Sequence, residues 1–240
     1  MRGPDDFADP ALDALLDEVY ELAETDLHAA LARLDDAGST WSDHPEVLYC
    51  RGSLVWEIHG PEAAMPHFER AIAADPKFSD ARYRLGEIHE LLGEDAEMIA
   101  QNLEVLKLDA ANDRQDGIGT PADQRFIAAA AEEVLAGVPE EFRARLGNVP
   151  IVLEARPSRT LVSEGFDPRA LGLFEGTDDL GQRTRGAGTT PTRIVLFYAN
   201  LLASFPDEDD LRDEIEVTIL HEIGHFFGLD EDDMARLELD

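Results

Sequence analysis

Hydrophobic positions recur at helical spacing through most of the chain, and the stripe near the C-terminus is the most regular. It contains Leu211, Ile215, Ile219 and Ile223, and it is widened by Val217, Leu220, Phe226 and Phe227. Side chains three and four positions apart share one face of a helix, so this pattern predicts a largely buried helix over residues 207–227. The acidic residues 207–210 follow Pro206 and fall in the first turn, where they oppose the positive end of the helix dipole.

The N-terminal half of the chain repeats, because Gly52 recurs as Gly86, 34 positions further on. The clearest unit carries, in order, Gly52, Ala64, Phe68, Ala71 and Pro76. This series of small, large and proline positions resembles the tetratricopeptide (TPR) pattern, in which small residues let paired helices approach and proline ends the second helix. We therefore expect TPR-like helical repeat units at 12–37, 46–75 and 79–109, with a degraded first unit and an atypical third one.

The second half of the chain contains strand-forming runs as well as helices. Residues 112–120 are polar, include glycine and predict a linker. Beyond them the sequence predicts helices at 121–136 and 139–146, strands at 149–155, 171–174 and 192–199, and loops at 156–168 and 176–191. We expect a TPR-like domain at 1–111, a linker at 112–120, and an α+β domain at 121–240 in which the helix over 207–227 packs against a small sheet.

The chain is strongly acidic, with 52 Asp and Glu against 20 Lys and Arg and a formal net charge of −32. The excess argues against nucleic acid and anionic membranes as partners. It would also favour cationic substrates, but a lysine-poor, Asp- and Ala-rich composition is better explained by a GC-rich or salt-adapted source. Cys50 is the only cysteine, the N-terminus lacks a hydrophobic signal region, and no run approaches the length of a membrane span. These features predict a cytoplasmic protein without an intrachain disulfide.

Within the predicted C-terminal helix, residues 221–225 read His-Glu-Ile-Gly-His. His221 and His225 share one helix face, and two imidazole nitrogens about 2.0–2.1 Å from a common centre form two corners of a tetrahedral zinc site. Glu222 can reach a water on the metal rather than the metal itself, which is the general-base position of a zinc hydrolase. The alternative is a pair of helical histidines that are hydrogen-bonded in a core. The metal site is favoured because a buried helix with these polar groups needs partners for them.

Five ordered segments resemble the small bacterial zincin-like metallopeptidase family: 138–146, 148–152, 171–176, 193–197 and 221–228. The resemblance covers the C-terminal two-fifths of the chain and implies a minimal zincin fold with a zinc cofactor. It also implies His221 and His225 as zinc ligands and Glu222 as the catalytic base. Membership of this family implies a peptidase, although a minimal site can also be reduced to a binding role.

The third zinc ligand is expected just beyond Gly228, which can end the helix in a left-handed conformation. In zincins with the longer motif this ligand stands six residues after the second histidine. Glu231 occupies that position here, where the family usually has aspartate, and Asp230 and Asp232 are the alternatives. Asp230 has a second possible role, as the cap of a short last helix over 234–239.

Two functions fit these patterns. The first is a zinc metallopeptidase that hydrolyses a peptide or protein substrate through a metal-activated water. Its TPR-like repeats would recruit the substrate or a protein partner. In zincins an extended substrate adds to the sheet edge, and we expect 192–200 to be that edge. An oxyanion donor would come from Tyr198 or an arginine of the 176–191 loop.

The second function is a TPR adaptor whose zinc site is structural or vestigial. Glu222 argues against this function, because a structural site needs no base.

Overall fold

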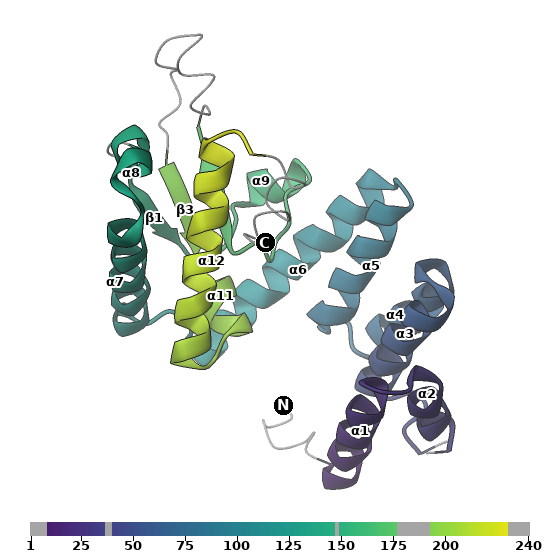
Figure 1. Cartoon of the computed structure of the whole chain (residues 1–240). Coiled ribbons are helices and arrows are strands. Elements are labelled where there is room, and N and C mark those ends of the chain that lie inside the picture. The colour runs from purple at the N-terminus through teal and green to yellow at the C-terminus, as the bar shows by residue number, and fades with distance from the viewer. Residues whose placement is uncertain (1–8, 37–39, 147–148, 177–192, 230–240) are drawn as a thin grey trace. The chain divides into compact units, whose positions relative to one another are not determined.

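The computed structural model of the protein describes residues 9–36, 40–146, 149–176 and 193–229 (Figure 1). The chain divides into two compact units, Met1–Leu108 and Asp109–Asp240. The described part of the first unit contains helices, whereas the second combines helices with a three-stranded sheet. A helical N-terminal region followed by an α+β domain agrees with the predicted fold class. Among the described helices, none combines the length and the apolar character that crossing a membrane requires.

Three consecutive helix pairs occupy the region of the predicted repeats. They are α1 (Pro10–Ala23) with α2 (Leu27–Asp36), α3 (Pro45–His59) with α4 (Pro61–Ala74), and α5 (Ser79–Leu91) with α6 (Asp95–Asp116). Each predicted repeat unit corresponds to one of these pairs. Both helices of the middle pair begin with proline at the first position, which needs no hydrogen-bond donor and favours the helical backbone angle.

The 34-residue period has a physical basis in the contacts of two glycines. A Cβ added to Gly52 would lie 2.6 Å from Cε1 of Phe68, so only glycine lets α3 and α4 pack this closely. In the next helix pair, a Cβ on Gly86 would lie 2.5 Å from Oδ1 of Asn102. Equivalent positions therefore contact each other in the two helix pairs, although Asn102 stands in the second pair where the first has Phe68. That these pairs are tetratricopeptide repeats stays a prediction.

Within its described residues, the second unit contains the helices and strands that the sequence predicts between 121 and 227, together with two further short helices. Its elements are α7 (Pro121–Gly137), α8 (Glu140–Leu146), β1 (Ile151–Glu154), α9 (Arg159–Ser163), β2 (Gly172–Glu175), β3 (Arg193–Phe197), α11 (Tyr198–Ser204) and α12 (Glu208–Phe226). Helices α9 and α11 were not predicted. The first lies in a segment predicted as a loop, and the second begins where the predicted strand over 192–199 was expected to continue. The short last helix predicted over 234–239 lies outside the described residues.

The sheet has the strand order β1-β3-β2, with β1 parallel and β2 antiparallel to β3. Strand β3 is therefore central, and the prediction that 192–200 forms the substrate-accepting edge is wrong. The physical reason is that β3 already pairs along both sides, with Val195 opposite Val152 on one side and Leu173 on the other. Its nearly continuous apolar sequence, Ile-Val-Leu-Phe, is typical of a strand that is buried on both faces.

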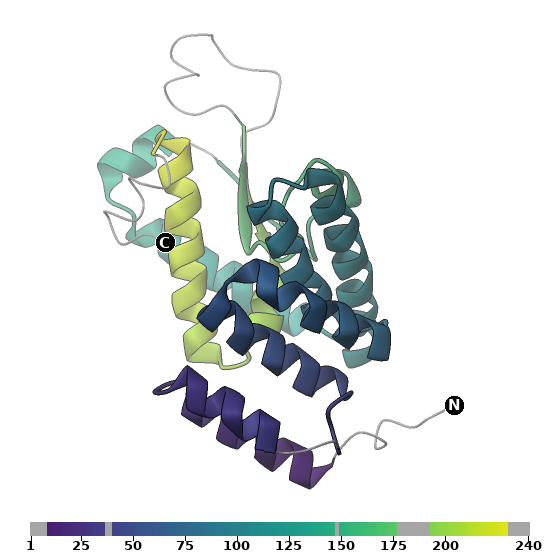
Figure 2. The ribbon, with the colours of Figure 1, turned by 90° about the vertical axis from the view of Figure 1, so that its right-hand side faces the viewer.

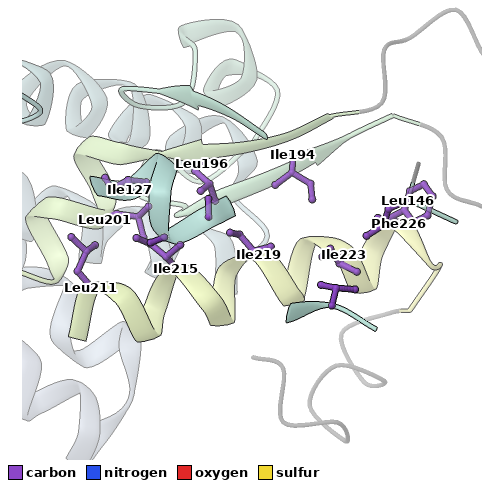
Figure 3. Packing of buried hydrophobic residues seen from close by; sticks show 13 residues of the cluster. Ile127, Leu146, Ile194, Leu196, Leu201, Leu211, Ile215, Ile219, Ile223 and Phe226 are labelled. Atoms are coloured by element: carbon purple, nitrogen blue, oxygen red, sulfur yellow. The ribbon is translucent and has the colours of Figure 1, made fainter. Parts of the chain in front are cut away.

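Helices α7 and α12 together cover one face of this sheet. They contact each other, α7 contacts β1, and α12 contacts β2 and β3. Figures 1 and 2 show α12 running alongside the strands. Figure 3 shows the core between these elements, in which Ile215 and Ile219 of α12 meet Ile127 of α7 and Leu196 of β3. The predicted apolar stripe of α12 is thus buried, but Val217 is exposed.

The C-terminal end of α6 is held by buried ion pairs within the second unit. Arg156, which follows β1, donates from Nε to Asp113 at 2.6 Å, and Arg169 donates from Nε to Asp109 at 3.0 Å. Arg156 is also hydrogen-bonded to Asn200 of α11. These pairs explain why the predicted linker at 112–120 is helical as far as residue 116. The chain then turns through Gly117 and Gly119, both with positive φ.

Candidate metal-binding and active site

Helix α12 carries the candidate site, and local signals at both its ends fix its position. At its start, the side chain of Asp207 accepts hydrogen bonds from the backbone of Asp209 and Asp210. At its end, Gly228 has φ of 79° and closes a Schellman motif, in which Leu229 N–H donates to the carbonyl of Gly224 at 3.1 Å. The expectation that Gly228 ends this helix in a left-handed conformation is therefore confirmed.

The two histidines of the motif converge on one point. The Nε2 atoms of His221 and His225 lie 3.1 Å apart, and the two rings are nearly perpendicular, at 82°. Two nitrogens that share a tetrahedral zinc ion at about 2.0–2.1 Å would be separated by about 3.3 Å. The pair therefore fits a zinc ion in both donor type and spacing. A hydrogen bond between neutral imidazoles is compatible with the same distance.

The expected third ligand falls outside the described residues, as do both alternatives: Glu231, Asp230 and Asp232. Within residues 9–36, 40–146, 149–176 and 193–229, no group of three or more His, Cys, Asp or Glu side chains has the arrangement of a metal site. The described part of the site thus supplies two nitrogen donors, and the position of an acidic third ligand remains a prediction.

Glu222 lies beside the histidines and is buried, with 7% of its surface exposed. Its side chain packs against Gly172 of β2, where an added Cβ would come 3.0 Å from Oε1 and 3.2 Å from Cγ. Thr218, one turn earlier on α12, meets the same glycine: its Cγ2 would lie 2.7 Å from that Cβ. A residue without a side chain at position 172 therefore lets the carboxylate of Glu222 lie directly against the strand.

A pocket of about 460 Å³ opens along α12 and β2, and His221, Glu222 and His225 line it. Its opposite wall is formed by residues 170–174, and Phe166 contributes from the segment before β2. The walls are mainly apolar, while the polar groups come from α12. An apolar pocket with a few converging polar side chains is the usual form of a small-molecule or peptide site.

Strand β2 offers a free backbone edge beside this pocket. Phe197 N–H donates to the carbonyl of Leu171 at 2.8 Å, and Leu173 stands opposite Val195 in the same register. Because hydrogen-bonded positions alternate along an antiparallel strand, the peptide groups of Gly172 and Phe174 point away from β3. Among the described residues no strand pairs with that side of β2. Among the described strands, the edge beside the pocket therefore belongs to β2, whereas the sequence predicted it at residues 192–200.

Of the proposed oxyanion donors, Tyr198 is not among the described residues that line the pocket. Its ring instead packs against Gly119, where it leaves no room for a Cβ. The arginines of the predicted 176–191 loop, Arg183 and Arg185, lie outside the described residues.

Sequence reasoning missed three residues of α12 that also line the pocket: Glu214, Val217 and Thr218. A signal for them was present. Glu214 and Thr218 precede His221 by seven and three positions, which places them on the same helix face as the histidines.

Comparison with known proteins adds a family to this geometry. A search of curated proteins gave no match to the chain. The family model described as a zincin-like metallopeptidase matches residues 146–240, from the last residue of α8 onward. The C-terminal part of the chain, which contains β1 to β3 and the histidine-bearing helix α12, is therefore similar to zincin-like metallopeptidases.

Proposed function

We propose that the chain is a zinc-dependent peptidase whose site lies on α12. The observation that carries this proposal is the convergence of the His221 and His225 Nε2 atoms, 3.1 Å apart, in a pocket that also contains the buried Glu222. The family match over residues 146–240 supports the same activity.

His221 and His225 would hold the metal through Nε2, and Glu231 would complete the protein ligands, with Asp230 and Asp232 as alternatives. A bound zinc ion supplies Lewis acidity and lowers the pKa of a bound water to about 7. Glu222 accepts a proton from the attacking water at its carboxylate and then delivers it to the amine nitrogen that leaves. Its burial against Gly172 supports this role, because a carboxylate held against the strand needs little reorganisation to act.

The free edge of β2 would position the substrate. An extended peptide that pairs with Gly172 and Phe174 gains main-chain hydrogen bonds that do not depend on its sequence. The same pairing places one of its peptide bonds beside His221, because β2 and the histidines line one pocket. The helical repeat unit would recruit the substrate or a protein partner.

The direct test is cleavage of an unbiased peptide library by the zinc-loaded protein and by the His221→Ala variant. We expect cleavage at defined bonds by the first protein and none by the second. If both proteins cleave equally, the site on α12 is not the active site.

A structural zinc site in an adaptor protein is the competing function. The metal content and thermal stability of His221→Ala separate the two. In a peptidase the variant loses zinc and melts within a few degrees of the wild-type protein. The reason is that the side chains by which α12 packs into the hydrophobic core include no histidine. In an adaptor with a structural site, loss of zinc would unfold the C-terminal unit.

A further inference from the structure

The pocket continues beyond the histidines toward the start of α12. Glu214, Val217 and Thr218 line this extension together with His221. Glu214 and His221 are seven positions apart, so they share a helix face and are separated by about 10 Å along the axis, at 1.5 Å per residue. An extended peptide spans that distance with about three residues at 3.3 Å each. A substrate side chain two or three positions from the cleaved bond would therefore reach Glu214.

The chemistry of this extension favours a cation. Among the described residues that line the pocket, none is lysine or arginine. Glu214 is partly buried and forms no ion pair or hydrogen bond with another described residue. Two other acids of this unit do have cationic partners: Asp109 pairs with Arg169 at 3.0 Å, and Glu133 pairs with Arg212 at 2.7 Å. No described cation therefore compensates the carboxylate of Glu214, which lies next to apolar walls where water screens a charge less than at an open surface.

Thr218 provides a second, independent sign that this wall binds a ligand. It lies one turn after Glu214 on the same face, and 6% of its surface is exposed. Its Oγ1 is buried and has no hydrogen-bond partner among the described residues. A buried hydroxyl without a partner is unfavourable, and a polar group of a ligand that reached it would satisfy it.

We propose that Glu214 forms a specificity subsite for a lysine or arginine side chain of the substrate, two or three positions from the cleaved bond. The aliphatic stem of such a side chain lies along Val217, which is 36% exposed in the pocket wall. Its ammonium or guanidinium group then meets the Glu214 carboxylate. This subsite rests on the proposed peptidase function for its biological use, but binding to it does not require turnover.

A binding experiment tests the subsite without catalysis. The probes are fluorescent decapeptides of alanine and valine that carry one substituted residue, which is Lys, Gln or Glu. Each peptide in the series places this residue at a different position. The peptides are titrated by anisotropy into the zinc-loaded Glu222→Gln protein, which keeps the pocket. We expect one position at which Lys binds about tenfold more tightly than Glu. Adding Glu214→Gln should remove that preference, and adding Glu214→Lys should reverse it. Glu216→Gln is the matched control, because Glu216 is exposed on the same helix and does not line this pocket.

Cleavage of the same peptides by the protein with Glu222 intact separates the two proposals. A preference for Lys that Glu214→Gln abolishes and Glu216→Gln retains supports the subsite. If Lys peptides bind preferentially through Glu214 but none is cleaved, the subsite is supported. The same result contradicts the proposed peptidase function. Equal binding of Lys, Gln and Glu peptides at every position overturns the subsite, as does a Lys preference that survives Glu214→Gln.

Discussion

The carboxylate of Glu222 packs so closely on Gly172 that a Cβ at residue 172 would lie 3.0 Å from its Oε1. The proposed base is therefore positioned by a strand fifty residues away in sequence, through the absence of a side chain. We predict that Gly172→Ala shifts Glu222 by a few tenths of an ångström and also pushes Thr218, whose Cγ2 would lie 2.7 Å from the added Cβ. We expect kcat to fall several-fold, because a catalytic carboxylate must keep its position. KM should change less, since the backbone edge of β2 is kept. Steady-state kinetics on a cleaved library peptide measure both.

Gly137→Ala is the matched control for this substitution. Gly137 ends α7, and a Cβ there would meet nothing within 4 Å. We expect unchanged kcat and equal or slightly higher stability in this variant. A Gly172→Ala protein as active as Gly137→Ala would show that the contact with residue 172 does not position Glu222.

The predicted and observed bounds of α12 agree almost to the residue, because residues next to each end of the helix determine where it begins and ends. Asp207 caps one end, Gly228 ends the other, and the apolar stripe between them has helical spacing. Strand order was not predictable in the same way, since it depends on pairing between residues such as Leu173 and Val195 that are distant in the chain. Helix α11 was missed because the apolar run continues from β3 through Tyr198 without a glycine or proline to mark the change.

The ion pairs at the end of α6 lead to a stability prediction. The side chain of Arg156 is 8% exposed and pairs with Asp113 at 2.6 Å. Arg156→Met leaves that buried carboxylate without its main partner and should lower the free energy of unfolding by about 3 kcal/mol. Urea denaturation followed by circular dichroism measures the change. The control is Arg143→Met, whose partner Glu140 is exposed and whose loss should cost less than about 1 kcal/mol. Equal effects would mean that the Arg156 pairs do not hold α6.

Cys50 leads to a prediction about pH. Burial raises the pKa of this thiol to about 11 from its usual 9.0. The folded protein therefore retains the proton between pH 9 and pH 11, where the unfolded chain loses it. Stability from this group is complete below pH 9 and falls by about 2 kcal/mol as the pH rises to 11. Urea unfolding at a series of pH values, compared between wild type and Cys50→Ala, isolates the effect. A fall of the same size in Cys50→Ala would rule out the thiol as its source.

The same burial predicts slow labelling of Cys50. With 1% of the residue exposed, the thiol should react with a maleimide at pH 8 at least a hundredfold more slowly in the folded protein than in urea. Mass spectrometry over time gives both rates. Rapid labelling of the folded protein would indicate that the helices around Cys50 open readily.

Zinc content and peptide cleavage, measured together on one preparation of Glu222→Gln, test the central claim most directly. Glu222 is proposed to move protons without holding the metal, so we expect the variant and the wild-type protein each to bind one zinc ion per chain. It should also cleave the preferred library peptide at least a hundredfold more slowly. Glu216→Gln, treated identically, should match the wild type in both measurements. Cleavage by Glu222→Gln at the wild-type rate, with zinc bound, would contradict the proposed role of α12 in catalysis.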